Sequence, residues 1–192
     1  MKRRVKLPKG KAIDIHYDET VYSPHYSSVD TIVLADFIGR AGDKVLDLSC
    51  GSGITGLAVK YLRPELEVHL TDNSEDAVRV TKENAENLNL DVEVFQADLG
   101  DERSWDMVIA NLPTYTKEDM KQELHGPDAT YFSHEKDGLY LYKKLFGKIK
   151  LNPGGILICE CQEKLQDSFV KLAYNNGYKL AIKNDFGFAF TK

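Results

Sequence analysis

The chain has 192 residues, of which 42% are hydrophobic and 29% are charged, and its formal net charge is −5. Such values are ordinary for one globular domain and argue against a disordered chain. No apolar run is long enough to span a membrane, and the acidic balance argues against broad, sequence-blind binding of nucleic acid.

The first 27 residues differ from the rest in charge. Six of the first eleven residues are lysine or arginine, and no apolar stretch follows them that would make a secretory signal. We therefore divide the chain into a basic extension, 1–27, with a short hairpin around Val5–Ile15, and one domain, 28–192. The extension is either a solvated terminus or an arm that steers the protein toward RNA. The three cysteines fit no zinc pattern, which indicates reduced thiols in a cytoplasmic protein.

Helical and strand periodicities alternate along the domain. A first helix, capped by Ser27 or Ser28, is expected to end at Gly39, and Ser74 is expected to cap a later helix. From residue 44 onward the pattern predicts strand 44–50, helix 54–62, strand 66–72, helix 74–88, strands 91–98 and 105–111, helix 137–150, strand 154–161, helix 163–176, and strands 178–184 and 186–192. Only Asn184 and Asp185 separate the last two apolar runs, which predicts a tight hairpin.

This order of elements predicts an α/β fold: a doubly wound, mostly parallel seven-stranded sheet with a C-terminal antiparallel hairpin. In sheets of this kind, ligands bind beyond the carboxyl ends of the strands. The residues that end the first strands are therefore the first candidates for a functional site.

A glycine-containing loop ends the first of these strands and opens a helix. It runs from Asp47 to Gly53 as Asp-Leu-Ser-Cys-Gly-Ser-Gly, and its glycines let a ligand approach the backbone closely. Asp72 ends the second strand, where an acid can accept from ribose hydroxyls, and Asp98 ends the third, where it can face an adenine amino group. Acids at three consecutive strand ends predict a nucleoside site.

Gly51, Gly53 and Gly56 also satisfy the G-x-G-x-x-G pattern of nicotinamide dehydrogenases. In those enzymes the loop usually opens the domain near the start of the chain, whereas 43 residues precede the strand here. The terminal antiparallel hairpin is also unlike the usual dehydrogenase sheet, so a dehydrogenase ranks last among the alternatives.

The glycine loop, the two later aspartates and the terminal hairpin together resemble class I S-adenosylmethionine-dependent methyltransferases. The resemblance implies that the loop holds the methionine part of S-adenosylmethionine, that Asp72 holds the ribose and that Asp98 holds the adenine. It implies cofactor contacts at Ser28, Asp47, Ser49, Gly51, Gly53, Asp72, Asn73, Asp98, Leu99 and Asn111. Ser49 departs from the family, which usually has glycine at this position.

The fourth strand ends in Asn111-Leu112-Pro113-Thr114-Tyr115, which resembles the Asn-Pro-Pro-Tyr motif of methyltransferases that act on planar nitrogens. The resemblance implies that the Asn111 side chain and the Leu112 carbonyl accept the two hydrogens of the target nitrogen and aim it at the methyl group. Pro113 would stiffen the loop, and Tyr115 would stack on the flat substrate. Leu112 stands where the family has its first proline, and Thr114 stands where it has the aromatic residue.

Further motifs resemble the HemK/PrmC-type protein-glutamine N5-methyltransferases. The resemblance covers about residues 20–192 and rests on Val21-Tyr22-Ser23-Pro24, His125-Gly126-Pro127, Asp137-Gly138-Leu139-Tyr140-Leu141-Tyr142, Pro153-Gly154-Gly155-Ile156-Leu157 and Glu160. Without a counterpart of the N-terminal helical domain of the bacterial release-factor enzymes, the chain is expected to be more similar to the single-domain branch. Members of that branch can work with a small zinc-binding activator subunit. The implied partners are a release factor or a ribosomal protein as substrate, and such an activator.

These residues predict a methyltransferase of a planar nitrogen, with a protein glutamine side chain as the first choice. N6 of adenine in RNA or DNA stays open, because the same acceptors serve amides and amino groups. A cofactor-binding but non-catalytic subunit of a methyltransferase complex also stays open, given the residues at 49, 112 and 114. The five histidines show no metal spacing, so no metal site is expected.

Overall fold

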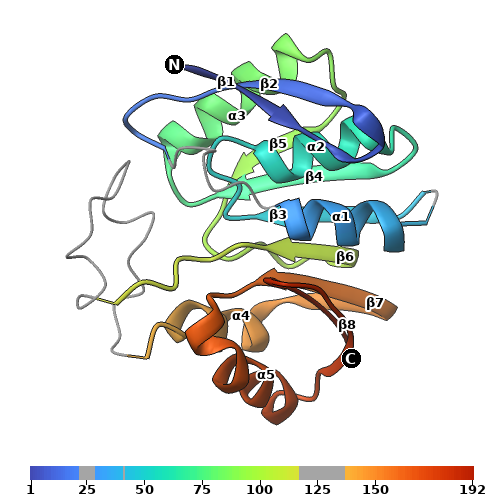
Figure 1. Cartoon of the computed structure of the whole chain (residues 1–192), viewed down its shortest axis with the longest axis vertical. Helices are drawn as coiled ribbons and strands as arrows, with labels where there is room; N and C mark the ends of the chain where they lie inside the picture. Colours follow the sequence, from blue (N-terminus) through green and yellow to red (C-terminus); the bar gives the residue numbers. More distant parts are fainter. Residues whose placement is uncertain (22–28, 41, 117–136) are drawn as a thin grey trace.

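A seven-stranded sheet organises the computed structural model, which describes residues 1–21, 29–40, 42–116 and 137–192. The strands lie in the order β5-β4-β3-β6-β7-β9-β8 (Figure 1). Their bounds are β3 (Lys44–Leu48), β4 (Glu67–Asp72), β5 (Glu93–Gln96), β6 (Ser104–Ala110), β7 (Lys150–Glu160), β8 (Lys179–Lys183) and β9 (Gly187–Thr191). Neighbours from β5 to β7 pair in parallel, whereas β9 pairs antiparallel with both β7 and β8. The predicted fold is therefore confirmed, including its antiparallel hairpin.

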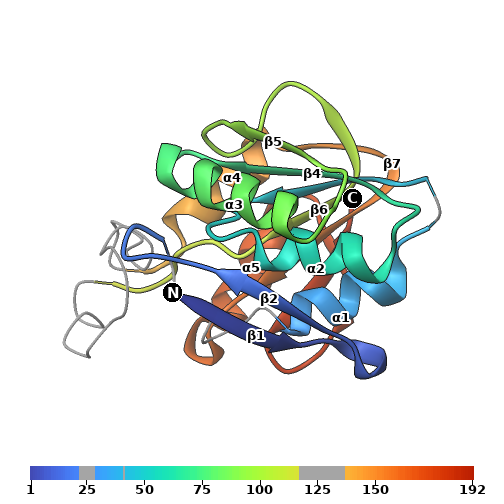
Figure 2. The ribbon, with the colours of Figure 1, turned by 90° about the horizontal axis from the view of Figure 1, so that it is seen from above.

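Helices cover both faces of the sheet (Figure 2). On one face lie α1 (Val29–Ile38), α2 (Ile54–Leu62) and α3 (Glu75–Asn87), and on the other lie α4 (Tyr140–Lys148) and α5 (Gln166–Asn175). Successive side chains of β3 alternate between the two layers: Val45 packs in the cluster that includes α1 and α2, and Leu46 packs in the cluster that includes α4 and α5. Burial on both faces explains why the parallel strands read as continuous apolar runs.

The predicted cap of α3 and the predicted bounds of α2 are confirmed. The Ser74 hydroxyl accepts from the Ala77 amide at 3.3 Å and caps α3, whose first turn carries Glu75 and Asp76. The bounds of α2 equal the predicted 54–62.

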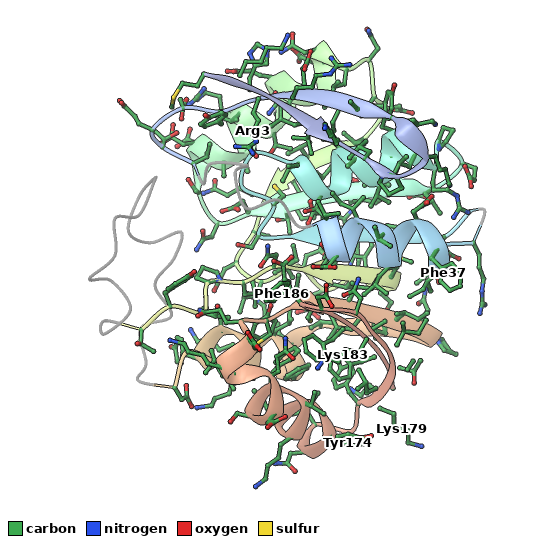
Figure 3. All side chains as sticks on the ribbon, in the orientation of Figure 1. Arg3, Phe37, Tyr174, Lys179, Lys183 and Phe186 are labelled. Carbon is green, nitrogen blue, oxygen red and sulfur yellow. The ribbon has the colours of Figure 1, made fainter. Side chains whose placement is uncertain are left out.

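Several boundaries differ from the predictions by one to four residues, notably at the start of β7 and in the turn between β8 and β9. α4 ends at Lys148 and β7 begins at Lys150, because Lys150 pairs with Ser104 at the start of β6. The helical spacing of the local sequence carries no information about that pairing. The turn between β8 and β9 holds three residues, not two. Phe186 belongs to it and is 44% exposed (Figure 3), while the Asn184 side chain accepts from the Gly187 amide at 2.8 Å.

An N-terminal hairpin of β1 (Lys2–Lys6) and β2 (Ala12–His16) packs on the same face as α2, with a short 3-10 turn between its strands. Its inward side chains are buried in the core: Val5, Leu7, Ile13 and Ile15. Its outward cations are partly paired, since Lys2 and Arg4 contact Asp14 and Lys9 contacts Asp36 at 2.8 Å. The expected hairpin around Val5–Ile15 is therefore present. Among the described helices, none combines the length and the apolar character that crossing a membrane requires.

Candidate functional site

The glycine loop after β3 turns back on itself through three residues with positive φ: Ser49 (62°), Gly51 (56°) and Gly53 (79°). A Cβ added at Gly53 would lie 2.8 Å from Thr81 Cγ2 and 2.9 Å from Leu57 Cδ1, so contact with α2 and α3 requires glycine there. A Cβ at Gly51 would meet no atom within 4 Å. The loop is therefore packed on its Gly53 side and open at Gly51.

Asp47 lies behind this loop near the end of β3 and is only 3% exposed. Its Oδ2 accepts from the Gly56 amide at 2.7 Å, which ties β3 to the first turn of α2. Burial raises the pKa of Asp47 to about 7; the Gly56 hydrogen bond opposes the rise, and the charge of Asp72 adds to it.

Asp72 ends β4 directly beside the glycine loop. Its Oδ2 accepts from the Gly51 amide and its Oδ1 from the Ser74 amide, each at 3.0 Å. Burial raises the pKa of Asp72, and these backbone bonds partly oppose the rise. The two carboxylates predicted from the first two strand ends therefore lie around one loop.

Of the other predicted cofactor residues, Asn73 follows β4, Asp98 and Leu99 follow β5, and Asn111 follows β6. Asn73 is exposed, and its carbonyl accepts from Gln96 at 2.9 Å. Asp98 is exposed and its carbonyl accepts from Lys148, whereas Leu99 has a φ of 53° and a side chain buried in the core. Ser28 lies outside the described residues, as do residues 22–24 and 125–127 of the predicted motifs.

α3 holds the loop from behind through residues that the sequence did not single out. Thr81 Oγ1 donates to the Gly51 carbonyl at 3.0 Å, and Asn84 Nδ2 donates to the Ser52 carbonyl at 2.9 Å. The Asn84 side chain also forms two hydrogen bonds with the His16 backbone, both at 2.8 Å: Oδ1 accepts from the amide, and Nδ2 donates to the carbonyl. The available signal was a pair of polar residues, three apart, within the buried stripe of an amphipathic helix.

The predicted catalytic segment leaves β6 beside the loop. Ala110 is the register partner of Leu48, so Asn111 and Ser49 leave adjacent strands at the same level. Asn111, Pro113 and Tyr115 are half-buried, and Leu112 is 3% exposed with its side chain in the core.

Three residues from later in the chain hold this segment. The Leu112 amide donates to the Tyr142 hydroxyl at 3.3 Å, and Gln162 Nε2 donates to Thr114 Oγ1 at 2.7 Å. A Cβ added at Gly138 would collide with the Thr114 carbonyl, so the segment lies tightly against the start of α4. Gly138 and Tyr142 belong to the Asp-Gly-Leu-x-x-Tyr motif, but the motif alone did not indicate these contacts.

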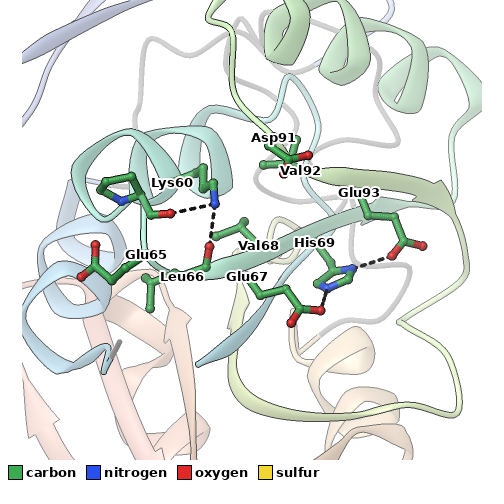
Figure 4. Close-up of a pocket in the computed structure, with 10 residues that line it drawn as sticks. Lys60, Glu65, Leu66, Glu67, Val68, His69, Asp91, Val92 and Glu93 are labelled. Carbon is green, nitrogen blue, oxygen red and sulfur yellow. Dashed lines mark hydrogen bonds and ion pairs between the residues drawn. The ribbon is translucent and has the colours of Figure 1, made fainter. Parts of the chain in front are cut away.

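A separate pocket of 340 Å³ lies at the amino ends of β4 and β5, away from the glycine loop (Figure 4). His69 lies in it between two carboxylates, with Nε2 3.0 Å from Glu67 and Nδ1 2.8 Å from Glu93. Asp91 and Glu65 also line it. Within the described part of the chain, no group of three or more histidine, cysteine, aspartate or glutamate side chains is arranged to hold a metal ion.

Comparison with known proteins assigns this fold and loop to a family. The family model described as the methyltransferase small domain matches residues 12–126. The chain belongs to the methyltransferase small domain family. Membership confirms the predicted enzyme class and the predicted resemblance, and S-adenosylmethionine is the cofactor expected of such methyltransferases.

Relatives of this methyltransferase chain include proteins named release factor glutamine methyltransferase. The one from Bacteroides thetaiotaomicron is 28% identical over 82% of this chain and 63% of its own length. The one from Borreliella burgdorferi is 31% identical over 69% of this chain and 51% of its own length. The chain thus spans less than two thirds of either relative.

Solved structures share the fold at lower identity. A ribosomal protein L11 methylase from Lactobacillus delbrueckii subsp. bulgaricus superposes with a TM-score of 0.71 at 16% identity, over 90% of this chain and 81% of its own. A methyltransferase from Pyrococcus furiosus superposes with a TM-score of 0.69 at 19% identity, over 93% of this chain and 88% of its own. Both confirm the methyltransferase fold.

Proposed function

We propose that this chain transfers a methyl group from S-adenosylmethionine to the side-chain amide nitrogen of a protein glutamine. The observation that carries the proposal is the pairing of Ala110 with Leu48, which sets the Asn111 segment beside the glycine loop. The names of the relatives support the same chemistry.

The residues around the loop fit the cofactor. Gly51 leaves open space where a side chain would otherwise lie, so a ligand can approach the backbone there. Each oxygen of Asp72 accepts one amide, and a carboxylate has about four acceptor positions, so both oxygens can also accept from the two hydroxyls of a ribose. When bound, S-adenosylmethionine supplies an electrophilic methyl group.

The catalytic segment orients and activates the nitrogen. The lone pair of an amide nitrogen is delocalised, so the nitrogen is a weak nucleophile. The Asn111 side-chain oxygen and the Leu112 carbonyl accept its two hydrogens, which fixes its direction and increases its electron density. Tyr115 supplies an aromatic face for the flat amide.

The first substrate to test is a release factor, because the relatives carry that name, and ribosomal proteins come second. A small activator subunit and a cytoplasmic location remain predictions. Adenine N6 is the competing acceptor, and the basic hairpin is the feature that would favour RNA. Ion pairs of Lys2, Arg4 and Lys9 with aspartates reduce that charge.

The test is transfer of tritiated methyl from S-adenosylmethionine into a lysate of the host, followed by digestion with protease or nuclease. We expect protease to release the label and N5-methylglutamine to appear in the hydrolysed product. Release by nuclease would contradict the glutamine assignment in favour of adenine. Absence of label from protein that binds S-adenosylhomocysteine, even with a host fraction added as activator, would contradict catalysis and favour a non-catalytic subunit.

A further inference from the structure

Tyr142 of α4 lies where β6 and β7 separate. The two strands pair in parallel up to Ala110 and Cys159, and pairing ends there. The Tyr142 hydroxyl lies between the two chains, 2.6 Å from the Glu160 carbonyl oxygen, 3.1 Å from the Ala110 carbonyl oxygen and 3.3 Å from the Leu112 amide. One side chain thus bridges the strand ends at the point where Asn111 begins.

These contacts reach both peptide planes that flank Asn111: the Leu112 amide donates to the hydroxyl, whereas the Ala110 carbonyl shares the single hydroxyl proton with the closer Glu160 carbonyl. The plane before it contains the Ala110 carbonyl, and the plane after it contains the Leu112 amide. A hydroxyl can donate one hydrogen bond and accept two, so it can accept from Leu112 while it donates to a carbonyl. The Leu112 carbonyl, the proposed second acceptor, follows in the same short segment.

The residue at 112 supplies one of the three contacts of this bridge. A proline in that position, as in the Asn-Pro-Pro-Tyr motif, has a fixed φ near −65° and no N–H to donate. Leu112 lacks the fixed φ of proline, and its backbone N–H can donate a hydrogen bond. Because Leu112 is buried, its amide needs a hydrogen-bond partner inside the protein, and Tyr142 supplies it.

We propose that Tyr142 is a positioning residue that holds the Asn111–Leu112 segment in its reactive orientation, in place of the restraint that a proline would give. The inference rests on the proposed function. Tyr142 is itself well fixed, since it is fully buried and its ring centroid lies 4.7 Å from that of Phe169. Burial raises the pKa of its hydroxyl well above the usual value, so the donor stays protonated.

The test compares Tyr142→Phe with Tyr178→Phe. Tyr178 is equally buried in the same cluster, and its hydroxyl has no hydrogen-bond partner among the described residues, so its removal breaks no bond of this kind. Calorimetry with S-adenosylhomocysteine gives the fraction of intact sites and the Kd. Methyl transfer is then measured per intact site, together with hydrogen exchange of the Leu112 amide.

We expect Tyr142→Phe to lower kcat per intact site by about 10- to 100-fold while the Kd for S-adenosylhomocysteine stays within about twofold. Leu112 should exchange at least about tenfold faster, because its amide loses its partner. Tyr178→Phe should match the wild type in all three measurements. A purely structural role would reduce the fraction of intact sites and leave kcat per site unchanged.

With an active wild type, the proposal is overturned if Tyr142→Phe and Tyr178→Phe have the same kcat per site; with an active or an inactive wild type, it is overturned if Leu112 exchange is the same in both variants. Exchange needs no substrate, so it decides the positioning claim even if the wild type methylates no glutamine, a result that would overturn the proposed function alone. A double-mutant cycle adds a second criterion. In a Leu112→Pro background the Tyr142→Phe change should cost less than in the wild type, and an equal cost would contradict the proposal.

Discussion

Ser49 carries a side chain in a backbone conformation that favours glycine. Its φ of 62° lies in the left-handed region, where a Cβ costs roughly 1–2 kcal/mol relative to the usual conformation. The sequence identified Ser49 as a departure from the methyltransferase pattern. The structure shows that the backbone has kept the glycine conformation and that the serine is accommodated with strain.

Replacing Ser49 by glycine is expected to raise the free energy of unfolding by up to about 1 kcal/mol, because the strain disappears while glycine adds entropy to the unfolded chain. For a chain of this length, that gain corresponds to a rise in Tm of about 2–4 °C. Thermal unfolding of Ser49→Gly measures it. Ser49→Ala is the matched control, since it keeps the Cβ and should show no gain. A rise in Tm in both variants would show that backbone strain at residue 49 is not the cause.

The candidate site was predictable from the sequence where a single residue type in a single position carries the chemistry. The glycines, the acids at the strand ends and Asn111 are of this kind. Thr81, Asn84 and Tyr142 act through contacts with residues 18 or more positions away, and no local pattern indicates which backbone group each one meets. Their roles therefore depended on the three-dimensional structure.

At the scale of elements, boundaries set by local sequence signals were predicted correctly, whereas a boundary set by pairing with a distant strand was not. Local capping signals and periodicity gave the bounds of α2 and the cap of α3. The start of β7 was missed because it depends on pairing with β6. A hairpin around Val5–Ile15 was predicted, but its attachment to α3 through Asn84 is non-local.

Asn84 links three elements, namely the hairpin, α3 and the glycine loop. Asn84→Ala removes three hydrogen bonds, two to His16 and one to the Ser52 carbonyl. We expect a loss of about 2–4 kcal/mol in the free energy of unfolding by urea and weaker binding of S-adenosylhomocysteine.

Asn87→Ala is the control for this change, because Asn87 is exposed on the same helix. It should alter the free energy of unfolding by no more than about 0.5 kcal/mol and leave cofactor affinity unchanged. If Asn84→Ala bound S-adenosylhomocysteine as tightly as the wild type, the link between α3 and the loop would have no functional role.

At the scale of the whole molecule, two buried acids link stability to pH. Burial raises the pKa of Asp47 to about 7 and the pKa of Glu160 to about 8, the latter with help from the charge of Asp30. Glu160 Oε2 is buried without a hydrogen-bond partner among the described residues. Both acids therefore hold protons in the folded chain that they release in the unfolded chain.

The folded chain binds more protons than the unfolded chain between about pH 4 and pH 8, so the free energy of unfolding should fall as pH rises through this window. The contribution of these acids is fully present below their unfolded pKa values and is lost above their folded ones. Urea unfolding from about pH 5 to pH 8 measures the slope. Glu160→Gln should make the slope shallower, and an unchanged slope would show that Glu160 does not titrate in this range.

The most direct test of the central claim is Asn111→Ala, assayed for methyl transfer and for binding of S-adenosylhomocysteine in the same preparation. The account predicts that transfer falls by about 10²- to 10³-fold or more, because an acceptor that orients the target nitrogen is lost. The Kd for S-adenosylhomocysteine should stay within about threefold, because the glycine loop and Asp72 remain intact. Transfer at the wild-type rate from Asn111→Ala would contradict the assignment of this segment as the catalytic site.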